Sequence, residues 1–103
     1  MNKNNIIVAP SMLACDFGNI QSEAQRMISS GADWLHLDIM DGHFVPNITF
    51  GSCVVAAIHK HHPDAFLDCH LMVSNPLQWI DALHKAGASS LTFHVESDDI
   101  IST

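Results

Sequence analysis

Apolar and polar residues alternate along two short segments of this chain, residues 34–39 and 66–72. Alternate side chains of a strand share one face. One face of each segment is apolar throughout, while the other mixes polar and apolar side chains. This pattern predicts two strands whose apolar faces pack under helices. Apolar residues at 6–9, which we expect to be buried, and at 91–95 predict two further strands.

Three segments between these strands have apolar residues at helical spacing. The first starts near Asp16 and ends at Gly31, the second covers residues 52–61, and the third runs from Asn75-Pro76 to Gly87. The residues expected to face inward are Ile20, Ala24, Met27, Ile28, Val54, Val55, Ile58, Trp79, Ile80 and Leu83. The order βαβαβαβ predicts an α/β fold with parallel strands. Repeating βα units fit a TIM (β/α)₈ barrel, which takes about 250 residues, so this chain supplies roughly half of one.

The chain is acidic and has few basic residues. Its formal net charge is −7, with four lysines and arginines together, so neither nucleic acid nor an anionic membrane is expected as a partner. Three cysteines without a CxxC motif indicate a reduced, cytosolic protein. No apolar run approaches the ~18 residues of a transmembrane helix, and residues 1–5 lack the apolar core of a signal peptide. The open edges of a four-stranded sheet favour self-association, so we expect a homo-oligomer.

The strongest candidate site consists of His36 and Asp38 on one predicted strand and His70 on the next. Residues i and i+2 of a strand share a face and lie about 7 Å apart at the backbone, so their side chains can converge on one ion or substrate. Two neutral imidazoles and a carboxylate suit Zn²⁺, Fe²⁺, Mn²⁺ or Co²⁺. A bound cation would stabilise an enediolate while a carboxylate moves a proton. The alternative is three unrelated buried groups, each satisfied by its own hydrogen bonds.

Two features beside this site have competing interpretations. The loop with Asp41, Gly42, His43 and Asn47 could cover a substrate, although turn chemistry explains Asp41 and Asn47 better. Met40 and Met72 end matching strands and could either form an apolar lid over the site or fill a gap in the core.

The remaining polar candidates are weaker. Ser11 could bind a ligand or cap a turn, and His94 alone is interpreted as a satisfied core histidine. Three histidines, His59, His61 and His62, resemble a metal-binding tract, but a solvated helix end is favoured because no carboxylate faces them. Cys69 lies on the helix side of its strand and is expected in the core.

Several motifs are absent from the sequence. No lysine lies on a predicted strand, which argues against a Schiff-base aldolase. There is no P-loop, GxGxxG motif or nucleophile elbow. No lysine or arginine lies near the strand ends, so a phosphate would need backbone N–H groups at a helix N-terminus.

Three blocks of sequence resemble the ribulose-phosphate 3-epimerase family in order and spacing. They are Ala9-Pro10-Ser11-Met12-Leu13, the run from His36 to Asn47 that reads HLDIMDGHFVPN, and Asp68-Cys69-His70-Leu71-Met72-Val73. The resemblance extends from about Ile6 to Glu96, and allulose-phosphate epimerases share the same blocks.

The resemblance implies a TIM barrel that interconverts D-ribulose 5-phosphate and D-xylulose 5-phosphate in the pentose phosphate pathway, through a metal-stabilised enediolate. It implies that His36, Asp38 and His70 hold a divalent metal together with an aspartate from the far half of the barrel. Asp38 would be one acid/base. The substrate-binding residues would be Ser11, His36, Asp38, Met40, His70 and Met72.

By this resemblance, residues 1–103 correspond to the N-terminal half of an epimerase barrel, a single incomplete domain without the second aspartate or the phosphate-binding loops. Two alternatives remain open. One is a truncated, non-catalytic half-barrel that binds metal or self-associates. The other is an allulose-6-phosphate 3-epimerase.

Overall fold

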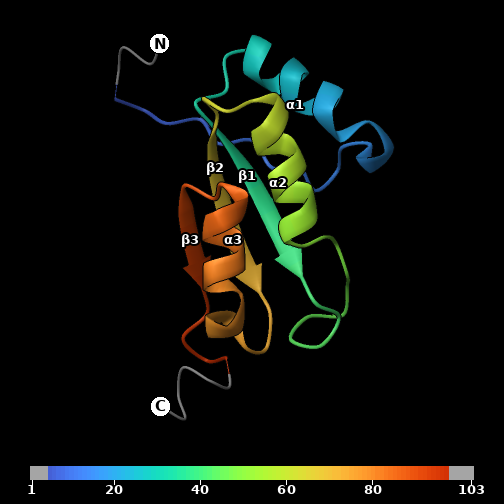
Figure 1. Cartoon of the computed structure of the whole chain (residues 1–103), viewed down its shortest axis with the longest axis vertical. Coiled ribbons are helices and arrows are strands. Elements are labelled where there is room, and N and C mark those ends of the chain that lie inside the picture. The colour runs from blue at the N-terminus through green and yellow to red at the C-terminus, as the bar shows by residue number, and fades with distance from the viewer. Residues whose placement is uncertain (1–4, 98–103) are drawn as a thin grey trace.

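The computed structural model describes residues 5–97. Residues 1–4 lie outside this range, so the expectation about a signal peptide falls mostly outside the described residues. Within the described range, helices and strands alternate in chain order (Figure 1). The elements are η1 (Phe17–Asn19), α1 (Ile20–Ser29), β1 (Trp34–Met40), α2 (Ser52–His61), β2 (Phe66–Met72), η2 (Pro76–Trp79), α3 (Ile80–Ala86) and β3 (Ser90–Phe93), where η marks a 3₁₀ turn.

The strands form a parallel sheet in the order β1-β2-β3, with β2 in the centre of the described part. β1 and β2 pair along their whole length, from Trp34 opposite Phe66 to Met40 opposite Met72. The rings of Trp34 and Phe66 stack with centroids 4.1 Å apart at the start of the two strands. The predicted α/β class is confirmed, and the arrangement is consistent with the first half of a TIM barrel.

The core lies between the sheet and the helices. Helices α2 and α3 lie over the same face of the sheet, and α1 lies beside α2 (Figure 1). The alternation of β2 follows the prediction, since Leu67, Cys69 and Leu71 are buried and the intervening residues are half-buried. Burial raises the pKa of the Cys69 thiol to about 12, so this cysteine is an inert core residue, as expected.

The structure confirms the predicted helix boundaries at Asp16, Gly31 and Gly87. Gly31 and Gly87 have φ angles of +105° and +110° after α1 and α3, a region that favours glycine. Asp16 caps the 3₁₀ turn before α1, where its side chain accepts a hydrogen bond from the N–H of Gly18.

Trp79 was expected to face inward, but it ends the 3₁₀ turn η2 and is 44% exposed.

The predicted first strand is wrong. Residues 6–10 are extended beside β1, and the carbonyl groups of Val8 and Pro10 accept hydrogen bonds from backbone N–H groups at 33, 34 and 36. Within residues 6–11, a β-bridge forms at Ser11, which pairs with His36. The side chains of Ile6, Ile7 and Val8 are 62%, 52% and 54% exposed, because no described element covers them. The apolar run indicated an extended segment correctly, but burial also requires a neighbour to pack against.

Candidate metal centre

The candidate site lies on the face of the sheet opposite α2 and α3. His36 and Asp38 come from β1, and Asp68 and His70 come from β2. The parallel register sets His36 opposite Asp68 and Asp38 opposite His70. A His-x-Asp segment is therefore paired with an Asp-x-His segment, and each imidazole has a carboxylate on the neighbouring strand.

The three predicted ligands converge. Oδ1 of Asp38 lies 3.1 Å from Nε2 of His36 and 3.1 Å from Nδ1 of His70. One ligand atom from each residue lies within 4.8 Å of the others, and the group could hold a metal ion. Asp38 is only 9% exposed, and a buried carboxylate requires charged or hydrogen-bonding partners to offset its desolvation.

Asp68 contacts Nδ1 of His36, the ring nitrogen that does not contact Asp38, and so orients the ring. Its Oδ2 lies 2.8 Å from Nδ1 of His36, and its Oδ1 accepts a 2.6 Å hydrogen bond from the hydroxyl of Ser90 on β3. Burial acts to raise the pKa of Asp68, but the hydrogen bonds from Ser90 and His36 bring it below its usual range. Burial also opposes charge on His36, yet the hydrogen bond to Asp68 and the charge of Asp38 raise its pKa. With its Nδ1–H donated to Asp68, His36 presents Nε2 to Asp38.

The donor set fits a divalent cation. Nε2 of His36, Nδ1 of His70 and Oδ1 of Asp38 can each offer a lone pair to a cation, and Oδ1 lies 3.1 Å from both nitrogens. Such a cluster is favourable when a proton or a cation lies between its members. The candidate ligands are two imidazoles and one carboxylate, and a second carboxylate, that of Asp68, hydrogen-bonds to one of the imidazoles. Zn²⁺ and Fe²⁺ are bound by ligand sets of this kind.

The other predicted site residues surround this cluster. The hydroxyl of Ser11 donates to Oδ2 of Asp38 at 3.1 Å and also accepts the N–H of Leu13, so the contact with Asp38 and the turn cap are both present. Met40 and Met72 are register partners at the ends of β1 and β2, and both are half-buried. Their substrate-side role remains a prediction.

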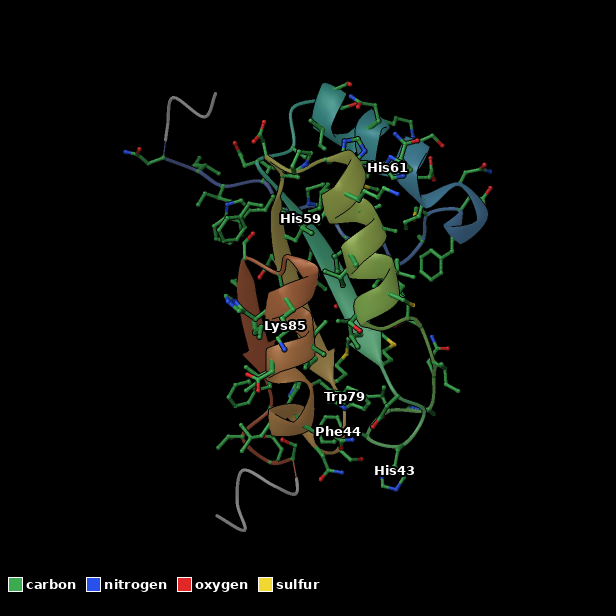
Figure 2. All side chains as sticks on the ribbon, viewed as in Figure 1. His43, Phe44, His59, His61, Trp79 and Lys85 are labelled. Atoms are coloured by element: carbon green, nitrogen blue, oxygen red, sulfur yellow. The ribbon has the colours of Figure 1, made fainter. Side chains whose placement is uncertain are left out.

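The loop after β1 is fixed by turn chemistry, as predicted. Oδ1 of Asp41 accepts the N–H groups of His43 and Phe44, and its Oδ2 accepts the N–H of Ser74. The ring of His43 hydrogen-bonds to the hydroxyl of Ser74, and Asn47 accepts the N–H of Ile48. Figure 2 shows His43 and Phe44 at the end of the molecule where Trp79 lies, away from His61.

One prediction about a histidine is wrong, and another is confirmed only in part. His94 is not a core residue, because its side chain is 38% exposed and Nε2 lies 2.9 Å from Nε2 of His70. Of the three histidines expected at a solvated helix end, His61 is exposed, but His62 is 9% exposed and donates Nε2–H to the carbonyl of Gln21. Among the described residues, these histidines join no metal-type cluster.

Asp68 and His94 were not recognised as part of the site. The signal for Asp68 was present in the sequence, because in-register parallel strands pair His-x-Asp with Asp-x-His. The role of His94 depends on the turn that follows β3, where Ser97 donates two hydrogen bonds to the carbonyl of His94. No local pattern in the sequence indicates that contact.

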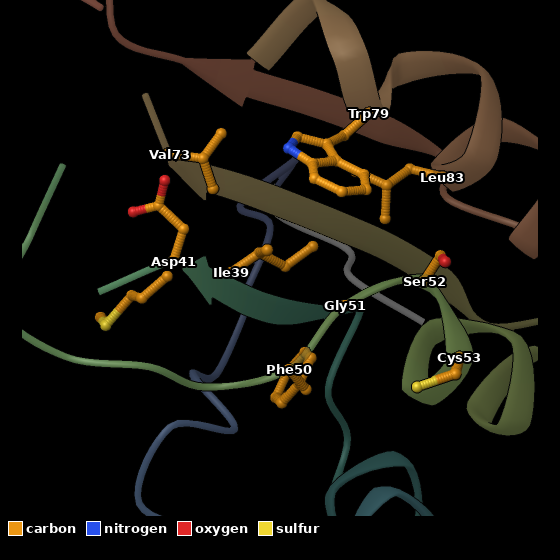
Figure 3. A pocket seen from close by; sticks show the side chains of 10 residues that line it. Ile39, Asp41, Phe50, Gly51, Ser52, Cys53, Val73, Trp79 and Leu83 are labelled. Atoms are coloured by element: carbon orange, nitrogen blue, oxygen red, sulfur yellow. The ribbon is translucent and has the colours of Figure 1, made fainter. Parts of the chain in front are cut away.

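A separate cavity of about 310 Å³ lies on the helix side of the sheet (Figure 3). Figure 3 shows Trp79 and Leu83 on one side of it and Phe50 and Cys53 on another. Its walls are mostly apolar, and none of His36, Asp38 and His70 lines it. The cavity is therefore distinct from the candidate metal centre.

No helix among residues 5–97 is long and apolar enough to cross a membrane. The parallel sheet, its helical layer and the His-Asp-His group on the opposite face define a βα-repeat protein of the TIM-barrel class with a metal-type site.

Comparison with known proteins gives the family. The sequence model of the ribulose-phosphate 3 epimerase family matches residues 7–103, and the chain belongs to this family. It is 60% identical over 89 residues to the cytoplasmic isoform of ribulose-phosphate 3-epimerase from Oryza sativa subsp. japonica. The matched region covers 86% of this chain and 39% of the rice protein. It is 46% identical over 101 residues to ribulose-phosphate 3-epimerase from Chlamydia trachomatis serovar D, covering 98% of this chain and 43% of that protein. The chain thus spans about two fifths of the length of these curated relatives.

Proposed function

We propose that this chain forms the N-terminal half of a barrel that interconverts D-ribulose 5-phosphate and D-xylulose 5-phosphate in the cytosol. The observation that carries the proposal is the convergence of His36, Asp38 and His70 on the open face of the sheet. Family membership supports the substrate class, a small sugar phosphate. The cytosolic location is supported by cysteines that are free in the described structure.

Asp38 is the proposed acid/base on this side of the substrate. Its Oδ1 is shared with both imidazoles, while its Oδ2 meets only the hydroxyl of Ser11. The second oxygen is therefore the one placed to exchange a proton with C3 of the ketose. Proton transfer next to a carbonyl generates an enediolate, and Asp38 needs a fixed position to perform it.

His36, Asp38 and His70 are the proposed ligands of a divalent metal. When bound, the metal would supply positive charge that stabilises the enediolate oxygen. Asp68 holds His36 in the ligating tautomer. The half-buried side chains of Met40 and Met72 at the ends of the two strands would exclude water from the reacting atoms.

The test follows deuterium incorporation at C3 of ribulose 5-phosphate by NMR in D₂O with Zn²⁺ or Fe²⁺. Asp38→Asn is compared with the matched control Asp81→Asn, an exposed aspartate on α3. We expect exchange with the wild-type chain and with the control. We expect at least a ~100-fold loss with Asp38→Asn, because general-base groups contribute about 10²–10⁴-fold.

Epimerisation itself needs proton transfer on both faces of C3. Joining this chain to the remaining part of the rice relative should therefore give xylulose 5-phosphate, and the same assay with allulose 6-phosphate tests the alternative substrate. A wild-type chain that is folded but exchanges no proton, alone or in the joined protein, contradicts the proposed function and leaves the non-catalytic half-barrel. Equal exchange by Asp38→Asn contradicts the role of Asp38.

A further inference from the structure

The cluster continues beyond His70 in a direction that the proposed function does not use. The far nitrogen of His70, Nε2, lies 2.9 Å from Nε2 of His94. The rings of the two histidines are 5.0 Å apart at their centroids and tilted by 31°. On the other side of His94, Nδ1 lies 3.3 Å from Oε1 of Glu96. Carboxylate, imidazole and imidazole thus form a row that ends at the candidate ligand atom of His70.

The position of His94 is fixed by its surroundings. Ser97, which is 1% exposed, donates both its N–H and its hydroxyl to the carbonyl of His94, at 3.1 and 2.6 Å. The ring of Phe44, from the loop after β1, lies 5.3 Å from the ring of His94. Backbone and ring are therefore held from two different segments, and the contact with His70 does not depend on a freely rotating side chain.

A neutral histidine carries one ring proton, and its partners decide which nitrogen has it. The carboxylate of Glu96 favours the proton of His94 on Nδ1, which leaves Nε2 as an acceptor. That acceptor favours the proton of His70 on Nε2, the tautomer in which Nδ1 has a free lone pair. The carboxylate of Asp38, 3.1 Å from Nδ1 of His70, favours the proton on Nδ1 instead, so the two contacts compete in the metal-free chain. A cation between Nδ1 and Asp38 would take the place of that proton and leave the contact with His94 as the one that holds the ring proton.

We propose that His94 is a positioning residue that, together with Glu96, favours the tautomer of His70 with its proton on Nε2, in which Nδ1 can bind metal. His36 has the equivalent partner in Asp68, so each ligating histidine has its far nitrogen engaged. The inference rests on the proposed metal role of His70. It predicts a property of the metal-free chain as well, namely that the contact with His94 increases the fraction of His70 rings that carry the proton on Nε2.

Three variants test the inference. His94→Phe keeps a ring beside Phe44 but removes the acceptor, His94→Gln restores a polar group near the position of Nε2, and His84→Phe removes an exposed histidine of α3 as a control. The first readout is the tautomer of His70 from ¹⁵N chemical shifts without metal. The second is Zn²⁺ affinity by competition with a chelator.

We expect a similar fraction of His70 with its proton on Nε2 in wild type, His94→Gln and His84→Phe, and a lower fraction in His94→Phe, where Asp38 is the remaining hydrogen-bond partner of the ring among the described residues. Zn²⁺ affinity should fall about 10–100-fold in His94→Phe and stay within about threefold of wild type in the other two variants. If the tautomer is the same in wild type and His94→Phe, or if His94→Gln binds as weakly as His94→Phe, the inference is wrong. The expected tautomers in a chain that binds no Zn²⁺ would support the role of His94 while contradicting the metal part of the proposed function.

Discussion

Asp38 combines three structural properties that bear on its role. It is almost fully buried, it shares one oxygen with two imidazoles, and its other oxygen meets a hydroxyl. Removing the charge would leave two histidine nitrogens without an anionic partner. For this reason the effect of Asp38→Asn on metal affinity and proton exchange should far exceed that of an exposed aspartate such as Asp81.

Asp41 gives a prediction about stability and pH. Burial acts to raise its pKa, but the N–H groups of Ser74, His43 and Phe44 bring it below its usual range. A carboxylate with a lowered pKa in the folded state contributes stability above its unfolded pKa and loses it as pH falls through the folded pKa. We expect Asp41→Asn to reduce the free energy of unfolding by about 1 kcal/mol at pH 7, because Asp41 is exposed and each hydrogen bond to it contributes modestly.

Urea unfolding at several pH values measures this effect. The difference between wild type and Asp41→Asn should shrink below about pH 4, where the unfolded carboxyl becomes protonated. Asp81→Asn serves as the control, since no described hydrogen bond fixes its side chain to the loop. A difference between wild type and Asp41→Asn that is unchanged from pH 7 to pH 3 would contradict the charge-based explanation.

At the residue scale, the sequence predicted the ligands but not their supports. His36, Asp38 and His70 follow from strand periodicity, because alternate side chains of adjacent strands must share a face. Predicting the contact of Asp68 with His36 requires the register of β1 and β2, and predicting that of His94 with His70 requires the path of the chain after β3. Periodicity carries no information on either.

Among the elements, the junction of α2 and α3 depends on Gly87. This residue has φ +110°, and a Cβ there would lie 2.4 Å from Cγ of the His59 ring. Gly31 has φ +105° but nothing within 4 Å of its Cβ position, so the pair separates backbone strain from steric clash. We expect Gly31→Ala to cost about 1 kcal/mol of unfolding free energy through strain alone. Gly87→Ala should cost about 2–3 kcal/mol or more, since overpacking adds to strain.

A double-mutant cycle checks the cause. In a His59→Ala background, the cost of Gly87→Ala should fall to that of Gly31→Ala, because the clashing ring is gone. Chemical denaturation of the four variants gives the required free energies. A cost of Gly87→Ala that is independent of residue 59 would mean that the ring moves aside without penalty.

The elements themselves were largely predictable. β1, β2 and α2 were expected within one residue of their observed bounds, because their apolar positions follow one period and end at turn-forming residues. The predicted burial of residues 6–9 is wrong because their side chains face no described layer. The predicted inward orientation of Trp79 is wrong because a 3₁₀ turn rotates side chains differently from an α-helix.

For the molecule as a whole, metal binding should add stability, because the candidate ligands join β1 to β2. A ligand that binds only the folded state at 100 times its Kd adds at most about 2.7 kcal/mol to the free energy of unfolding. We expect Zn²⁺ to raise the denaturation midpoint of the wild-type chain and a chelator to reverse the rise. Asp38→Asn should show little change, and an equal rise in that variant would indicate binding elsewhere.

The open face of the sheet and the exposed apolar residues beside β1 underlie a prediction about assembly. We expect the chain to sediment as a dimer or larger species at micromolar concentrations. Substituting both Ile6 and Val8 by lysine should shift it toward monomer, since both are more than half exposed beside the edge of the sheet. Ile48→Lys, on a loop and 74% exposed, is the matched control. A wild-type chain that sediments only as a monomer would contradict the expectation.

The pairing of Asp38 with His70 across β1 and β2 has a consequence for folding fidelity. A shift of one residue between these strands would turn Cys69 or Leu71 toward Asp38 and bury the imidazole under the helices. Parallel strands rich in similar apolar residues, such as Leu35, Leu37, Leu67 and Leu71, discriminate weakly between neighbouring alignments. The polar pairs discriminate strongly, because the observed alignment sets each aspartate, Asp38 and Asp68, opposite a histidine, and a shifted alignment does not. The polar pairs of the site therefore also favour the native alignment of β1 and β2.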